Sequence, residues 1–171
     1  RKNLISTTNW LVNVDKRLTL KQAIPHIKFL QDKKANAGHK NENAKNYFTC
    51  NNISKKDLGF IEFTDITYQN ETLDNYSDAL ISLDSLSNAT AIAFDSSNII
   101  TIASTSLKTM FLETTKDSLP YYVKKCDTIN GIILLNFQED LSFQNYIDYK
   151  SIIEKTDLKQ SKISLKEFIF N

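Results

Sequence analysis

Residues 128–170 read TINGIILLNFQEDLSFQNYIDYKSIIEKTDLKQSKISLKEFIF, and the pattern predicts a strand, a helix and a second strand. The first part, residues 132–137, is apolar at nearly every position. A strand of this kind buries both of its faces, as strands do at the centre of a sheet. We therefore expect residues 132–137 to form the central strand.

The segment after this strand has the spacing of an amphipathic helix. Ser142 is the expected N-cap of a helix over residues 143–155, and its apolar stripe is Phe143, Tyr146, Ile147 and Ile153. Residues 161–170 then alternate. Ile163 and Leu165 fall on one face, opposite Lys162, Ser164 and Lys166, which predicts a half-exposed strand protected by lysines.

The amino-terminal part repeats this order. Residues 9–15 predict a strand, and Thr19 with Gln22 forms a capping-box pattern before a helix whose apolar stripe is Leu20, Ala23, Ile24, Ile27 and Leu30. Pro25 should kink or split this helix, or mark its regular start.

The two parts also align with each other. Residues 10–30 match residues 133–153 without a gap, with identities at Leu11/Leu134, Asn13/Asn136, Leu18/Leu141 and Ile24/Ile147, and with Thr19 opposite Ser142. We interpret this as a shared strand-turn-helix architecture. Internal duplication and chance are the alternatives.

Between these units the pattern is weaker. We expect a long basic loop at residues 33–56, a strand at 58–68 with a bulge at Gly59, and a hairpin of strands 89–95 and 99–104. Helices are expected at 74–86 and 106–115, and a short extended piece at 121–123. The fold prediction is one α+β domain over residues 1–171, with three or four helices packed on a mixed sheet.

Composition agrees with a single packed domain. The chain has 171 residues, of which 41% are hydrophobic, and its low Gly and Pro content is typical of an AT-rich genome. Cys50 and Cys126 could form one bridge, but free buried thiols are preferred. No transmembrane segment is expected. Because the chain begins at Arg1 rather than Met, we expect a processed or excerpted product. The missing part could be a signal peptide or an anchor, so export or tethering to the cell envelope is favoured while the localisation stays open.

Catalytic motifs are missing from the sequence. With three glycines, the chain has no GxGxxG, GxxxxGK[ST] or GxSxG motif, and it has no HExxH or CxxC. We expect no cofactor and no metal. Carboxylates do follow the predicted strands, at Asp15, Asp65, Asp95, Glu139 and Asp140. They could serve metal-dependent chemistry, but turn and helix-capping roles are preferred.

Charge is segregated along the chain. Residues 1–56 carry twelve Lys or Arg against three Asp or Glu, whereas residues 57–107 carry eight acidic residues and no basic one. The two parts could neutralise each other within the fold. Alternatively, the basic loop binds a protein partner with an acidic surface through Lys33, Lys34, Lys40, Lys45, Tyr47 and Phe48. Nucleic acid is less expected, because the sequence pI is about 7.9.

Residues 134–165 have a further likeness. Their strand, their helix rich in Tyr and Ile, and their closing strand resemble the last strand-helix-strand of the periplasmic domain of ExbD and TolR proteins. That resemblance implies an energy-transduction role in the cell envelope. The residues themselves favour a non-catalytic protein-interaction domain, such as an accessory, immunity-type or envelope component. A small enzyme with acidic residues at its strand ends is the other alternative.

Overall fold

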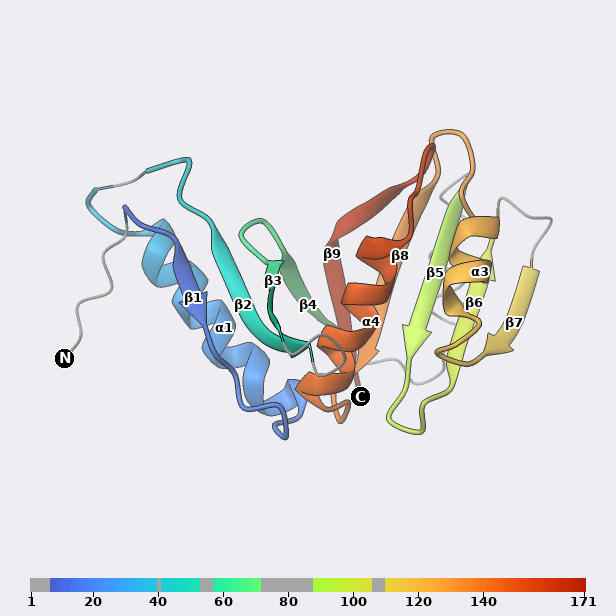
Figure 1. Cartoon of the computed structure of the whole chain (residues 1–171), viewed down its shortest axis with the longest axis horizontal. Coiled ribbons are helices and arrows are strands. Elements are labelled where there is room, and N and C mark those ends of the chain that lie inside the picture. Colours follow the sequence, from blue (N-terminus) through green and yellow to red (C-terminus); the bar gives the residue numbers. More distant parts are fainter. Residues whose placement is uncertain (1–6, 40, 53–56, 72–87, 106–109) are drawn as a thin grey trace.

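The strands that the structure describes form two sheets (Figure 1). The computed structural model describes residues 7–39, 41–52, 57–71, 88–105 and 110–171. A three-stranded sheet has the order β1-β2-β3, and a six-stranded sheet has the order β4-β9-β8-β5-β6-β7. With three helices in the described part of the chain packed on these sheets, the fold is a single α+β domain, as predicted. The elements are β1 (Trp10–Val12), α1 (Leu20–Ala35), β2 (Asn46–Asn52), β3 (Asp57–Glu62), β4 (Thr67–Glu71), β5 (Ala89–Phe94), β6 (Ile100–Ser104), β7 (Met110–Thr114), α3 (Leu119–Lys125), β8 (Ile132–Gln138), α4 (Phe143–Lys155) and β9 (Lys162–Phe170).

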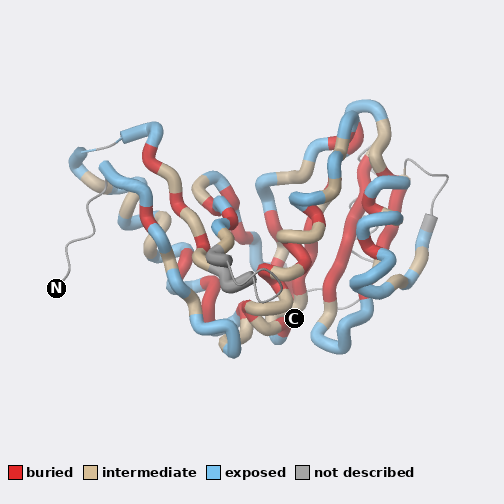
Figure 2. Tube along the Cα trace, viewed as in Figure 1, coloured by how far each residue is buried: buried red, intermediate tan, exposed pale blue. Residues whose placement is uncertain are grey.

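Strand β8 lies inside the larger sheet, which confirms the predicted central strand. It pairs in parallel with β9 on one side and with β5 on the other. Ile133, Leu135 and Phe137 are buried in the main core, on the face that α3 and α4 cover. Leu134 points to the other face, where it packs against a small alanine cluster. Figure 2 shows the buried positions concentrated on these inner strands.

Two strand-helix-strand units share one design. In the first, β1, α1 and β2 end in a parallel pair of strands, and in the second β8, α4 and β9 do the same. The two helix starts are bonded to each other: the N–H of Leu20 donates to the carbonyl of Leu141 at 3.0 Å, and the N–H of Phe143 donates to that of Leu18 at 2.7 Å. Thr19 and Ser142, aligned in the sequence, form the antiparallel bridge between them. The aligned positions are therefore paired around a local two-fold axis.

The local signals of both helices are confirmed. Ser142 caps α4 by accepting a hydrogen bond from the N–H of Asn145, and Thr19 with Gln22 forms the capping box of α1. Helix α1 begins at Leu20 and continues through Pro25, so the predicted alternative of a start at Pro25 is wrong. Because Pro25 has no N–H, the helix loses one backbone hydrogen bond there, while the buried face on either side remains in place.

The middle of the chain needs several corrections. Residues 33–56 are not one loop, since α1 ends at Ala35 and β2 begins at Asn46. The strand predicted over residues 58–68 is two strands in different sheets, β3 and β4. In β3, Gly59 pairs in register with Cys50 without a bulge.

Two further short elements were assigned to the wrong type. The helix predicted over residues 106–115 is replaced in its described part by β7, which pairs with the edge of β6. Residues 121–123, expected to be extended, lie in helix α3. In both places sheet pairing and packing override weak local preferences. The hairpin of β5 and β6 is confirmed, with Asn98 at a φ of 65° in its turn. The helix predicted over residues 74–86 lies outside the described residues.

The two neighbouring leucines of β8 allow a matched test of the core. Leu135 is 1% exposed and belongs to the main core, whereas Leu134 is half-buried. Leu135→Ala should lower the free energy of unfolding by about 2–5 kcal/mol, because it leaves a cavity in a packed region. Leu134→Ala should cost clearly less. Urea denaturation of both variants checks this, and equal losses would contradict the assignment of faces.

Candidate functional site

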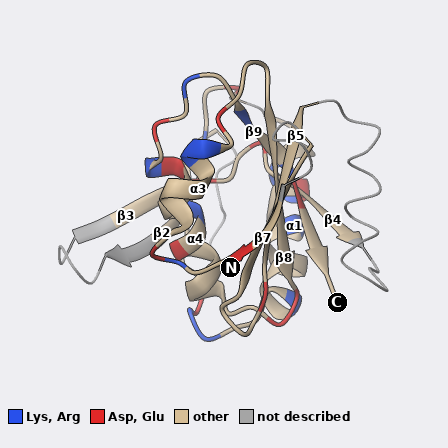
Figure 3. Ribbon diagram, turned by 90° about the vertical axis from the view of Figure 1, so that its right-hand side faces the viewer, with Lys and Arg blue, Asp and Glu red and all other residues tan. Residues whose placement is uncertain are grey.

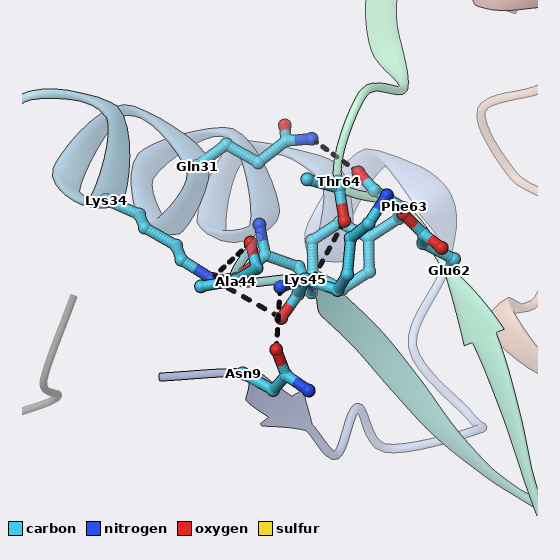
Figure 4. A network of polar contacts seen from close by, with 9 residues as sticks. Asn9, Gln31, Lys34, Ala44, Lys45, Glu62, Phe63 and Thr64 are labelled. Carbon is cyan, nitrogen blue, oxygen red and sulfur yellow. Dashed lines mark hydrogen bonds and ion pairs between the residues drawn. The ribbon is translucent and has the colours of Figure 1, made fainter. Parts of the chain in front are cut away.

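Lys34, one of the predicted partner-binding residues, has a structural role (Figure 4). Its Nζ donates to the carbonyls of Ala44 and Lys45, both at 3.3 Å, and to Oδ1 of Asn46 at 2.7 Å. It also lies 5.3 Å from the centre of the Trp10 ring, a cation–π distance. Burial lowers the pKa of this lysine. Lys34 therefore links the last turn of α1 to the residues at the start of β2 by hydrogen bonds.

The other predicted residues do not form one surface. Phe48 is fully buried and stacks on Phe63 at 3.9 Å, so it cannot contact a partner, and this part of the prediction is corrected. Lys45 pairs with Glu62 at 2.7 Å, which joins the basic and acidic parts of the sequence. Lys33 is exposed on α1, and Lys40 lies outside the described residues.

Tyr47 is the predicted residue that faces outward on β2. Its ring meets that of Phe60 on β3 edge to face, with centroids 6.4 Å apart. Leu11, paired with Tyr47 in register, is 60% exposed, and Phe60 is 52% exposed. The outer face of the smaller sheet therefore presents apolar side chains to solvent.

Phe60 also lines a groove between β3 and α4. The groove has a volume of about 960 Å³. Residues 59–61 of β3 form one wall, and α4 with its N-cap forms the other, including Ile147 and Ile152. The remaining lining residues are polar or charged: Lys16, Arg17, Lys116, Ser142, Gln144, Asp148, Ser151, Glu154 and Lys155.

Basic groups exceed acidic groups around the groove. Arg17 pairs with Asp15 at 2.7 Å, and Lys116 pairs with Asp148 at 2.5 Å. Hydrogen bonds from Arg17 lower the pKa of Asp15 to about 2, so this partner stays ionised. In the described part of the chain no carboxylate pairs with Lys16 or Lys155. Figure 3 shows acidic and basic positions interspersed around α3 and α4.

A buried polar cluster lies behind the α4 wall. Lys150 Nζ pairs with Oε1 of Glu167 at 2.5 Å, and both side chains are almost fully buried. The hydroxyl of Tyr146 donates to Oε2 of Glu167 at 2.7 Å, and the hydroxyls of Tyr146 and Tyr68 lie 3.3 Å apart. Burial and the charge of Glu167 raise the pKa of both tyrosines well above the usual range, so both stay protonated and can donate.

An irregularity in β9 places Glu167 in this cluster. Ile133 pairs with Ile163, but Leu135 pairs with Glu167, so β9 has two more residues than β8 in this interval. Leu165, expected on the core face, is instead 57% exposed, and Glu167 takes the next inward position. Regular alternation in the sequence gives no sign of this irregularity, so the cluster could not be predicted from it.

Glu154 connects the two regions, because it lines the groove and also a smaller pocket of about 210 Å³ beside Lys150. The residue as a whole is exposed, but its carboxylate is partly desolvated and lies near Glu167 and Glu62. Burial first, and then these two neighbouring charges, raise the pKa of Glu154, although Lys150 acts in the opposite direction.

Two more of the predicted strand-end carboxylates, besides Asp15, have polar partners. Glu139 pairs with Lys21 at 2.6 Å, and Asp95 accepts a hydrogen bond from the N–H of Ile99. In the described ranges, no three or more His, Cys, Asp or Glu side chains are grouped so that they could hold a metal ion. Cys126 is a free, buried thiol whose pKa is raised by burial. No helix among the described residues has the length and apolar character needed to cross a membrane.

The buried ion pair predicts an asymmetric effect of mutation. Lys150→Met alone leaves the Glu167 carboxylate buried without its cation and should lower the free energy of unfolding by about 3–5 kcal/mol. The double variant Lys150→Met/Glu167→Leu should recover much of this loss. Lys159→Met is the control, because its pair with Asp157 is exposed and contributes little. Urea denaturation at neutral pH measures all three, and a double variant no more stable than Lys150→Met would contradict the argument.

Similarity to known proteins gives no further information about the groove or the cluster. The structure does contain the strand, helix and strand, β8, α4 and β9, on which the resemblance to ExbD and TolR proteins was based. That likeness remains one of sequence pattern. Comparison of the chain with protein-family models, with curated proteins and with solved structures finds no match.

Proposed function

We propose that this chain is a non-catalytic protein-interaction domain and that its groove binds an acidic segment of a protein partner. The observation that supports this is that one groove is lined both by an exposed aromatic side chain, Phe60, and by two lysines, Lys16 and Lys155. Neither lysine has a carboxylate partner among the described residues. Partner-binding sites commonly combine an aromatic anchor with a charged rim.

The two walls of the groove suit this role. The wall on β3 offers Phe60, with Tyr47 against its ring, as a contact surface that loses little side-chain entropy on binding. The wall on α4 offers the half-buried Ile152, with Ile147 buried beneath it. It is fixed from behind by the Lys150–Glu167 pair, so the groove is formed before a partner arrives.

Charge determines the kind of partner. The lining contains four basic residues and two acidic ones, and no described carboxylate forms an ion pair with two of the basic residues, Lys16 and Lys155. A negatively charged segment would be steered toward such a groove and held in register by it. The proposed surface keeps Tyr47 from the sequence prediction but replaces its lysines with Lys16 and Lys155.

Reversing these two charges tests the proposal. Lys16→Glu/Lys155→Glu should abolish capture of acidic partners by the immobilised domain, with little change in melting temperature, because both side chains are at the surface. Lys33→Glu/Lys162→Glu is the matched control, since it changes the net charge equally at exposed positions outside the groove. Captured proteins are identified by mass spectrometry, and their affinities are then measured with each variant. Equal affinity for the groove variant and wild type would contradict the proposal.

The raised pKa of Glu154 predicts how binding depends on pH. Ionised Glu154 repels an acidic segment, and because its pKa is raised it takes up a proton at a higher pH than an ordinary glutamate. Binding should therefore tighten as the pH falls from 7 toward 5, more for the wild type than for Glu154→Gln. At pH 7 the Gln variant should bind about two- to fivefold more tightly. Titrating one partner against both proteins at several pH values separates this effect from protonation of the partner itself.

A further inference from the structure

We infer that the acidic segment binds as an added β-strand along the edge of β3. This rests on the proposed function, because it concerns how the same groove holds its partner. Strand addition uses main-chain hydrogen bonds for affinity and alternate side-chain pockets for specificity. Three features of the groove support it: the position of β3 in its sheet, the direction of its backbone groups, and the nature of the opposite wall.

Strand β3 is an edge strand. In the order β1-β2-β3 it has β2 on one side, and no described strand pairs with its other side. Three consecutive residues of β3, Gly59, Phe60 and Ile61, line the groove. The groove therefore follows the edge of the sheet over a continuous piece of backbone.

Alternate residues of β3 turn their backbone groups away from β2 at this edge. The N–H of Phe63 donates to the carbonyl of Asn46 at 2.9 Å, so the backbone groups of Phe63 point toward β2. In an antiparallel ladder, successive residues turn their N–H and C=O groups to opposite sides. The backbone groups of Ile61 consequently point toward β2, as those of Phe63 do. The backbone groups of Phe60 and Glu62 point to the opposite side, away from β2. Among the described residues none forms a backbone hydrogen bond with Phe60 on that outer side.

The side chains on the other wall, formed by α4, indicate which residue types the bound segment should contain. A strand beside β3 would present its side chains alternately to two sides. Its apolar side chains would contact the half-buried Ile152 on α4, and its acidic side chains would meet the ammonium groups of Lys16 and Lys155, which line the same groove. The expected ligand is therefore an extended protein segment in which acidic and apolar residues alternate.

A synthetic probe tests this on the wild-type protein. The probe is a capped octapeptide of alternating Glu and Val, and the control is a block peptide with four Glu followed by four Val. The alternating peptide should bind with a dissociation constant below about 1 mM and at least tenfold more tightly than the block peptide. Absence of binding by the alternating peptide, or equal binding of both, would overturn the inference.

Methylated peptides test the backbone bonds directly. N-methylation of all Val residues removes the N–H groups on one side of the strand, and N-methylation of all Glu residues removes those on the other. One of these two peptides should lose binding at least tenfold, and the other should retain it. If both keep full affinity, the segment does not bind as a strand, although the charge-reversal experiment can still support the groove as the binding site.

A pair of variants tests the same point from the protein side. Phe60→Ala removes the aromatic side chain but keeps the outward N–H, whereas Phe60→Pro removes both and leaves the bonds of Ile61 to β2 in place. Phe60→Pro should bind the alternating peptide at least tenfold more weakly than Phe60→Ala, with thermal unfolding as the control for folding. Equal affinities of two folded variants would overturn strand addition. Lys16→Glu/Lys155→Glu, titrated with the same peptide, reports separately on the charge requirement.

Discussion

The position of α4 depends on one buried ion pair. Lys150 and Tyr146 of α4 both bond to the carboxylate of Glu167 on β9, and Tyr68 of β4 extends this contact to the edge of the larger sheet. Such a pair gains little stability over apolar residues of the same volume, because two charges lose their hydration. It does favour one geometry. Since α4 forms a wall of the groove, the geometry of the candidate site follows from this pair.

The smaller sheet is attached to this centre in two ways. Phe48 of β2 meets Phe143 and Tyr146 of α4, with ring centroids 5.1 and 6.4 Å apart, so its aromatic side chain joins the cores of both sheets. The reciprocal bonds between the starts of α1 and α4 fix the two units at the end where their helices begin. The groove lies between walls that are each held to the same core.

How much the sequence could predict depends on the range of the interactions. The central strand, both helix caps and the β5–β6 hairpin rest on neighbouring residues, and all of them were predicted. Strand β2 was missed because its inward position, Phe48, stands among Asn and Lys residues that favour a loop. Glu167 depends on an irregularity in pairing, and the groove depends on how β3 and α4 meet. Neither leaves a periodic pattern in the sequence, so the site residues Lys16, Phe60 and Lys155 could not be identified there.

The link between the helix starts also has a consequence for the order of folding. Leu18 and Leu141, which accept its two hydrogen bonds, are about 120 residues apart in the chain, and β4 finds its described partner only in β9, the last strand. Contacts of such high sequence separation form slowly, because a long loop must close before they give any stabilisation. During synthesis, the amino-terminal unit therefore leaves the ribosome without the surface on which it packs. The contacts of Phe48 with Phe143 and Tyr146 cannot form until helix α4 has been made.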